Sequence, residues 1–170
     1  GESLFWSWTQ GGGVNYFALM SYYLMSPLNF LTVFLPSEWL REFLMFSVVI
    51  KVACASMFMA IFLRSLFKKN DFSLVIFGCS FGFCAFFMGY YWNTIWLDTV
   101  CITPLVALGA VKLFTEGKFR LYIVSLALSL LTNYYIGLFA CIFVLLSFIA
   151  YNIVKWDGIK KFATNLLRTG

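Results

Sequence analysis

Residues 121–154 read LYIVSLALSLLTNYYIGLFACIFVLLSFIAYNIV, with Arg120 before them, Lys155 after them and no charge between. As one straight helix this stretch would be about 50 Å long, whereas the hydrocarbon core of a bilayer is about 30 Å thick. Two helices that turn back near Asn133 instead keep both basic ends on one side of the membrane. A polar turn at that depth is tolerated only where it is buried in protein or lines a wet cavity. The stretch therefore predicts a helical hairpin within a polytopic membrane protein.

The composition of the whole chain agrees with a membrane protein. Of its 170 residues, 62% are hydrophobic and 11% are charged, whereas soluble domains have about 45–50% and about 25%. The chain has no His, and its five Cys stand singly within apolar runs. We therefore expect neither disulfides nor a metal site in this segment. We attribute the net charge of +5 to the basic residues that cytoplasmic loops of membrane proteins collect. We therefore expect no nucleic-acid partner.

The same reasoning along the chain predicts an all-α transmembrane bundle with about five membrane helices. We expect these helices at 43–63, 73–91, 99–114, 121–133 and 136–154. Before them, glycines, prolines and many aromatic residues predict an extracytoplasmic loop at 1–42, made of interfacial helical pieces. After them, residues 159–170 predict a cytoplasmic basic amphipathic segment. We interpret residues 1–170 as a single piece of a larger membrane domain.

The basic residues predict the orientation of these helices. Ten of the twelve Lys and Arg residues fall in the segments that the predicted spans place on one side. Because cytoplasmic loops collect Lys and Arg, that side is expected to be the cytoplasm. Residues 1–42 and 92–98 then face outward, and the protein is predicted to be multi-pass in the cell membrane.

Lys51 is a charged residue inside a predicted membrane helix, where a charge is unfavourable. It lies about 12 Å from the outer end of its predicted helix, where a charge costs a few kcal/mol. Its ammonium is a candidate for binding an anionic headgroup, such as a lipid phosphate, that enters from the side. A structural ion pair or a side chain that snorkels to the surface would explain it equally well.

A second candidate is the predicted outer loop at 92–98. Trp92 and Trp96 are suited to stacking on a sugar ring, while Asn93 and Asp98 could bind hydroxyl groups or, for Asp98, act as a general base. The alternative is that Asp98 caps the helix that follows and that the tryptophans anchor the interface.

Two further patterns have their own alternatives. Asn133, Tyr134 and Tyr135 place an amide and two phenols at the sunken turn, where they either line a substrate cavity or form a simple turn with interfacial tyrosines. Gly78 and Gly82, four residues apart, favour close packing of two helices.

Several motifs together resemble the bacterial YfhO-type family of large membrane proteins. The similarity runs in order along essentially the whole chain. Its pieces are residues 1–4 (GESL) through Trp8, a glycine turn, SYYLMSPLN at 21–29, FLP at 34–36, Lys51, YWNTIWLD at 91–98 and LLTNYYIG at 130–137.

The resemblance implies a GT-C-like fold and transfer of a sugar from a polyprenyl-phosphate carrier to an extracellular polymer such as lipoteichoic acid. The lipid-linked sugar is itself the donor, so no cofactor is implied. Lys51 would neutralise the carrier phosphate, and Asp98 would accept a proton from the acceptor. The family's principal catalytic acid is expected upstream of Gly1, in which case this piece alone would be inactive.

Two other classes of function fit the same residues. A transporter or lipid-linked-sugar flippase also has broken helices and an embedded cation, and would move its substrate without forming a glycosidic bond. A non-catalytic membrane scaffold would tolerate replacement of Lys51 and Asp98.

Overall fold

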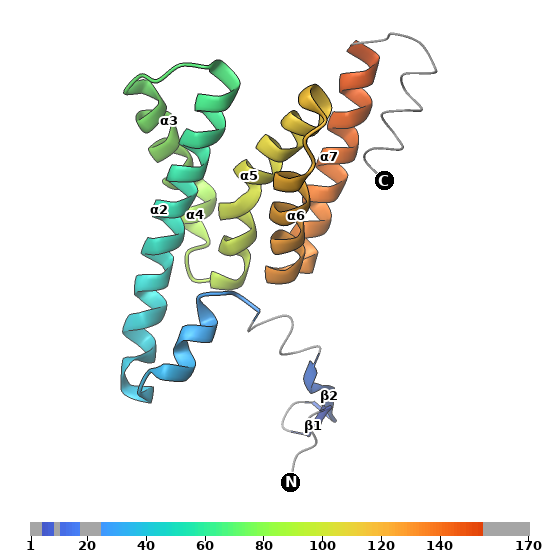
Figure 1. Cartoon of the computed structure of the whole chain (residues 1–170). Helices are drawn as coiled ribbons and strands as arrows, with labels where there is room; N and C mark the ends of the chain where they lie inside the picture. The colour runs from blue at the N-terminus through green and yellow to red at the C-terminus, as the bar shows by residue number, and fades with distance from the viewer. Residues whose placement is uncertain (1–4, 9–10, 18–24, 155–170) are drawn as a thin grey trace.

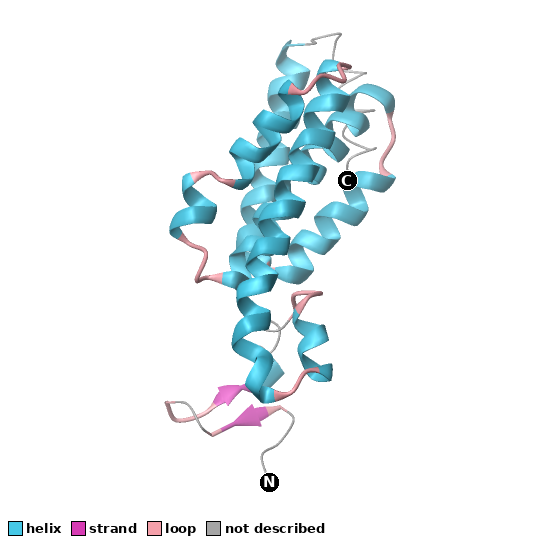
Figure 2. Ribbon diagram, turned by 90° about the vertical axis from the view of Figure 1, so that its left-hand side faces the viewer, coloured by secondary structure: helices cyan, strands magenta, loops and turns pink. Residues whose placement is uncertain are grey.

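The structure is a computed structural model of the chain, and it describes residues 5–8, 11–17 and 25–154. Nearly all of the secondary structure in these ranges is helical (Figure 2). The helices are α2 (Leu40–Phe67), α3 (Ser73–Gly82), α4 (Ala85–Gly89), α5 (Thr94–Glu116), α6 (Arg120–Thr132) and α7 (Tyr134–Val154). The all-α expectation is confirmed. The predicted amphipathic segment at 159–170 lies outside the described residues.

Three helices in the described part of the chain are long and apolar enough to cross a membrane. They are Ser37–Phe67, Thr94–Glu116 and Tyr134–Val154, while Ser73–Gly89 and Arg120–Thr132 are apolar but shorter. α7 has 21 residues, whereas α6 has 13 and is only about 20 Å long at 1.5 Å per residue. Of the five expected membrane helices, three are long enough to span a membrane, and the two at 73–91 and 121–133 correspond to shorter apolar segments.

The segment before α2 differs from the expected interfacial helices in one respect. Strands β1 (Trp6–Ser7) and β2 (Val14–Asn15) pair antiparallel, and their turn contains Gly11, Gly12 and Gly13, all with positive φ. Glycine adopts such angles without the clash that a Cβ would cause, so the glycines close a hairpin. The short 3₁₀ helices η1 (Asn29–Phe34) and η2 (Ser37–Trp39) then lead into α2.

The predicted helix at 73–91 is broken in the structure. α3 ends at Gly82 and α4 begins at Ala85, with Cys84 in an extended conformation between them. α3 lies against α2, where a Cβ on Gly78 would come within 2.6 Å of the Ser56 backbone oxygen. This contact agrees with the predicted close packing of the glycine stripe.

The helix expected at 99–114 begins earlier, at Thr94, and ends at Glu116. The outer loop expected at 92–98 is therefore wrong for residues 94–98, which form the first turns of α5. What remains is the short connection 90–93 between α4 and α5. Burial against two helices explains the change, because Leu97 and Asp98 pack on α2 and Thr99 packs on α6.

The hairpin expected around Asn133 is present, with one residue between its helices. Asn133 is extended, with φ −158° and ψ 105°, and this single residue reverses the chain between α6 and α7. Figure 1 shows the tip at the same end of the bundle as the start of α5, while α2 continues well beyond it. The tip is thus recessed relative to the end of α2.

The two ends of the bundle differ in charge. The α2–α3 and α5–α6 connections and the end of α7 lie together at the upper end in Figure 1. They carry Lys68, Lys69 and Lys118. We call this the basic end. The opposite end, with the 90–93 connection and the α6–α7 tip, is called the aromatic end.

Candidate functional site

A buried ion pair joins α2 to α5. The Lys51 ammonium lies 2.9 Å from Oδ2 of Asp98 and also donates a hydrogen bond of 2.9 Å to the Thr94 backbone oxygen. Only 3% of the Lys51 side chain and 8% of the Asp98 side chain are exposed. The two residues are 47 apart in sequence, so the pair fixes how the two helices meet.

The pair is placed by the helices around it. On α5, Asp98 is flanked by buried Leu97 and Thr99. One turn along α2 from Lys51, fully buried Ala55 packs with Leu97 in the same apolar cluster. A buried charge without a partner is costly in such surroundings. The pairing satisfies both side chains at once.

These contacts change the interpretation of Asp98. It lies in the second turn of a helix that begins at Thr94, so it is neither a loop residue nor the cap of a helix that begins at 99. Lys51, in turn, does not snorkel, because its ammonium is held in the buried pair. The predicted structural ion pair is therefore present. A role in binding substrate stays a prediction.

A second set of buried polar contacts joins α5 to α6. The Thr99 hydroxyl is 3.2 Å from the Ser129 backbone oxygen and 3.1 Å from the Thr132 hydroxyl. Ser125, Ser129 and Thr132 are all buried, at spacings that place them on one face of α6. The sequence patterns did not predict that these residues contact one another. The feature of the sequence that indicates such contacts is the row of hydroxyl side chains on one face of an otherwise apolar helix.

Asn133 is the buried residue at the recessed tip. Its side-chain oxygen accepts a 3.0 Å hydrogen bond from the Ile136 backbone N–H, as an N-cap residue does. The residue is 1% exposed, and its side-chain nitrogen has no hydrogen-bond partner among the described residues. The neighbouring Tyr134 and Tyr135 are 61% and 49% exposed. The hydrogen bond to the amide oxygen agrees with the prediction of a simple turn. The amide nitrogen remains available to donate a hydrogen bond.

The predicted aromatic residues lie at the same end of the molecule. Tyr90 contacts Trp92 and Trp96, with ring centroids 6.2 and 6.3 Å apart. Trp92 is exposed. The Trp96 indole N–H is buried and has no partner in the part of the chain that the structure describes. Asn93 is half-buried and precedes α5, although its side chain makes no capping hydrogen bond.

Thr99 links the ion pair to the recessed tip. It is adjacent in sequence to Asp98, and its partner Thr132 is adjacent to Asn133. The hydroxyl pair thereby lies between the Lys51–Asp98 ion pair and Asn133, three of the predicted residues. Trp92, Tyr134 and Tyr135 are the exposed members at this end.

The arrangement combines a fixed carboxylate, a fixed cation and unpaired donors near exposed aromatic rings. An ammonium has three N–H groups, and two of those on Lys51 are used by Asp98 and Thr94. Asp98 balances the charge of Lys51, so the pair offers hydrogen bonds but no net positive charge. Aromatic faces and amide N–H groups are suited to a polar ring with hydroxyls, such as a sugar.

Comparison with known proteins gives a single positive result. A family model described as "Bacterial membrane protein YfhO" matches residues 1–169. No curated protein matches the chain, and no solved structure does either. The match covers nearly the whole chain, and the apolar helices agree with it. The chain therefore belongs to the YfhO family of bacterial membrane proteins.

Proposed function

We propose that the chain is part of a membrane glycosyltransferase. The enzyme would move a sugar from a polyprenyl-phosphate carrier to an extracellular polymer such as lipoteichoic acid. The buried Lys51–Asp98 ion pair at the α2–α5 contact is the observation that carries the proposal. An ionised pair within an apolar bundle is costly to maintain, and intramembrane ionisable residues commonly serve function.

In this proposal Asp98 acts as general base. The bond between the anomeric carbon and the carrier phosphate oxygen breaks, and a bond from that carbon to the acceptor oxygen forms. The proton of the acceptor hydroxyl passes to the Asp98 carboxylate. Lys51 holds that carboxylate in place, and its third N–H donates to the departing phosphate.

In this proposal Lys51 alone does not neutralise the negative charge of the carrier phosphate, so other groups stabilise the remainder. Because Lys51 is already neutralised by Asp98, it contributes one directed hydrogen bond instead of a free positive charge. The family resemblance implies that the principal acid lies upstream of Gly1. Asp98 then ranks as a supporting base and Lys51 as its positioning residue.

The other site residues would bind the sugar. Trp92, Tyr134 and Tyr135 offer exposed aromatic faces at the aromatic end of the bundle. Asn133 and Trp96 have buried N–H groups with no partner in the structure, and Asn93 adds an amide in the 90–93 connection. Together they supply the stacking surface and donors that a hydroxylated ring requires.

The orientation belongs to the same proposal. The basic end would face the cytoplasm under the positive-inside rule. The aromatic end, including residues 1–42 and the 90–93 connection, would then face outward. A polyprenyl-linked sugar presented on the outer leaflet would reach the ion pair through the bilayer side of the bundle.

The test uses the complete parent gene in a deletion strain of its host. Sugar substituents on lipoteichoic acid and wall polymers are measured by NMR after complementation with wild type, Asp98→Asn or Lys51→Met. Loss of substituents on deletion, return with wild type and failure with Asp98→Asn support the proposal. Unchanged polymers in the deletion strain overturn it.

Protein amount must be controlled, because removing one partner leaves the other charge buried. The double variant Lys51→Met/Asp98→Asn removes both charges and so preserves folding better than either single variant. If the double variant accumulates normally but transfers no sugar, the pair has a role beyond folding. Full transfer by a normally accumulating double variant contradicts the proposed roles. Lys118→Met, at an exposed ion pair, is the matched control.

A lipid-linked-sugar flippase is the second candidate, favoured by the recessed, broken hairpin at Asn133. The two functions differ in where the donor accumulates when the protein is missing. Donor exposed outside but unused indicates a transferase, and donor retained inside indicates a flippase. The same deletion cells answer both questions when the lipid-linked sugar is assayed on each side.

A further inference from the structure

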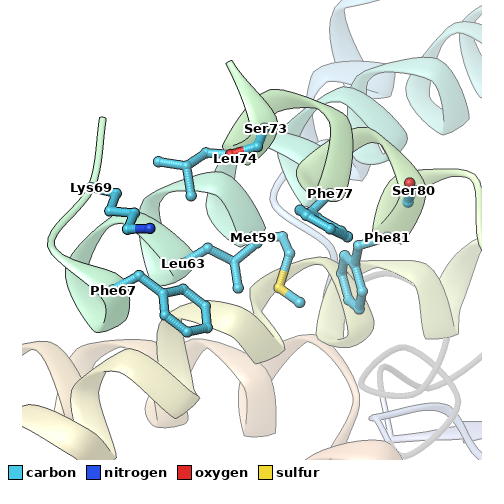
Figure 3. Close-up of a pocket in the computed structure, with 9 residues that line it drawn as sticks. All are labelled: Met59, Leu63, Phe67, Lys69, Ser73, Leu74, Phe77, Ser80 and Phe81. Atoms are coloured by element: carbon cyan, nitrogen blue, oxygen red, sulfur yellow. The ribbon is translucent and has the colours of Figure 1, made fainter. Parts of the chain in front are cut away.

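A cavity of about 610 Å³ lies between α2 and α3, near the basic end of the bundle. Its walls are largely apolar, with Met59 and Leu63 from α2 and Phe77 and Phe81 from α3. Figure 3 shows these side chains around a common space. The volume falls within the range of roughly 300–1,000 Å³ that is typical of small-molecule sites. The cavity shares no residue with the ion-pair site.

One cation stands at the rim of this apolar space. α2 ends at Phe67, and Lys68 takes a left-handed conformation with φ 53° that turns the chain back toward α3. The turn brings Lys69 to the cavity, and Figure 3 shows its ammonium directed between Leu63 and Leu74. Among the described residues, Lys69 has no ion pair and no hydrogen-bonded partner for its ammonium.

The local charge favours an anionic occupant. Arg64 in the last turn of α2, Lys68 and Lys69 stand against a single nearby acid in sequence, Asp71. The cavity itself is lined by no acidic residue. The site thus joins an apolar wall to an unpaired cation, which is the chemistry of a lipid with a negatively charged headgroup.

We infer that this cavity binds one anionic phospholipid, with an acyl chain between α2 and α3 and its phosphate on Lys69. The dimensions agree with this occupant. Met59 lies eight residues before the end of α2 at Phe67, so the apolar wall extends about 12 Å below the headgroup level. Lys69 follows the helix end, where a lipid phosphate lies.

Charge complementarity favours this lipid over other occupants. A free phosphate would leave the apolar wall without a partner, and a zwitterionic phospholipid would bring a second cation to an end that already carries Arg64, Lys68 and Lys69. A helix from elsewhere in the full-length protein would have to bring its own acid to this rim. An anionic phospholipid satisfies the wall and the cation together.

The test uses the full-length protein, purified in detergent and delipidated. It is incubated with equal amounts of phosphatidylglycerol and phosphatidylcholine that carry identical acyl chains, and the retained lipids are counted by native mass spectrometry. Wild type should retain phosphatidylglycerol preferentially. Lys69→Met should lower that preference by roughly fivefold, since one lysine near an anionic lipid contributes about 1 kcal/mol. Lys118→Met, an exposed lysine also at the basic end, should leave it unchanged.

A second variant tests the apolar wall. Ser80 lines the cavity, and Ser80→Trp should fill the space and remove retention of both lipids while size-exclusion behaviour stays normal. Retention of phosphatidylglycerol by Lys69→Met at the wild-type level overturns the inference. So does the absence of retained lipid in wild type, which would indicate that another helix covers the cavity. Equal thermal stabilisation by inorganic phosphate alone would indicate a simple anion site and would also overturn it.

Discussion

The described residues form two lysine–carboxylate ion pairs of similar geometry and very different surroundings. Lys118 and Glu116 at the basic end are 2.7 Å apart, and Lys51 and Asp98 between α2 and α5 are 2.9 Å apart. The side chains of the first pair are 74% and 47% exposed, whereas those of the second are 3% and 8% exposed. The shorter distance belongs to the pair whose charges water can solvate. Burial, and not separation, determines what each pair contributes.

The difference follows from what happens when one partner is removed. At an exposed pair, water replaces the missing charge, and salt already screens the attraction. In the bundle, no solvent replaces it, and the remaining charge is left unpaired among apolar side chains. The buried pair therefore holds α2 and α5 in register, while the exposed pair does little for the fold.

The largest expected effect is the loss of one member of the buried pair. Lys51→Met leaves Asp98 buried without its cation and should lower the free energy of unfolding by about 3–5 kcal/mol. Titration of the purified protein from detergent into SDS, followed by circular dichroism, measures this value. The double variant Lys51→Met/Asp98→Leu should recover most of the loss. A single variant as stable as wild type would mean that the charges are solvated.

The sequence identified Lys51 as anomalous but did not reveal its partner. The position of a lysine within its own apolar helix is a local property of the sequence, and it is enough to show that the lysine is unusual. Asp98 was assigned to an outer loop because Trp92, Trp96 and Asn93 are typical of an interface. Tertiary contacts overrode that local preference. The ammonium of Lys51 made burial of the Asp98 carboxylate acceptable, so α5 begins at Thr94.

The hairpin at Asn133 was predictable because length arithmetic decides it. The apolar run 121–154 is too long for one span, and Asn133 is the amide that lies nearer its middle. The hydroxyl contacts of Thr99 were not predictable, because they depend on how α6 rotates against α5. The sequence thus predicts the turn, while the packing of its helices sets which polar groups meet.

The second-largest loss of stability is expected where α3 packs against α2. Gly78→Ala places a Cβ within 2.6 Å of the Ser56 backbone oxygen, and backbone cannot rotate away as a side chain can. We expect a loss of about 1–3 kcal/mol, measured by the same SDS titration. Gly89→Ala is the matched control, since a Cβ there meets nothing within 4 Å. Equal behaviour of the two variants would contradict close packing at Gly78.

A smaller effect is expected from the hydroxyl contacts between α5 and α6. Thr99→Val keeps the shape of the side chain but removes its contacts with Ser129 and Thr132. The loss should be about 0.6–1.7 kcal/mol, the range found for hydrogen bonds between membrane helices. Thr115→Val removes a bond to Val111 within the same helix at an exposed position and should change stability less. The reverse order would show that α6 does not depend on Thr99.

The smallest expected effect sharpens the opening contrast most directly. Lys118→Met removes an ion pair of 2.7 Å between the Lys118 ammonium and the Glu116 carboxylate. Glu116 is solvated, so it keeps its charge stabilised by water after the lysine is gone. The SDS titration should give the wild-type midpoint, and raising the ionic strength should change neither protein. A loss comparable to that of Lys51→Met would mean that distance, and not burial, governs these pairs, and the structural role assigned to the Lys51–Asp98 contact would then lose its physical basis.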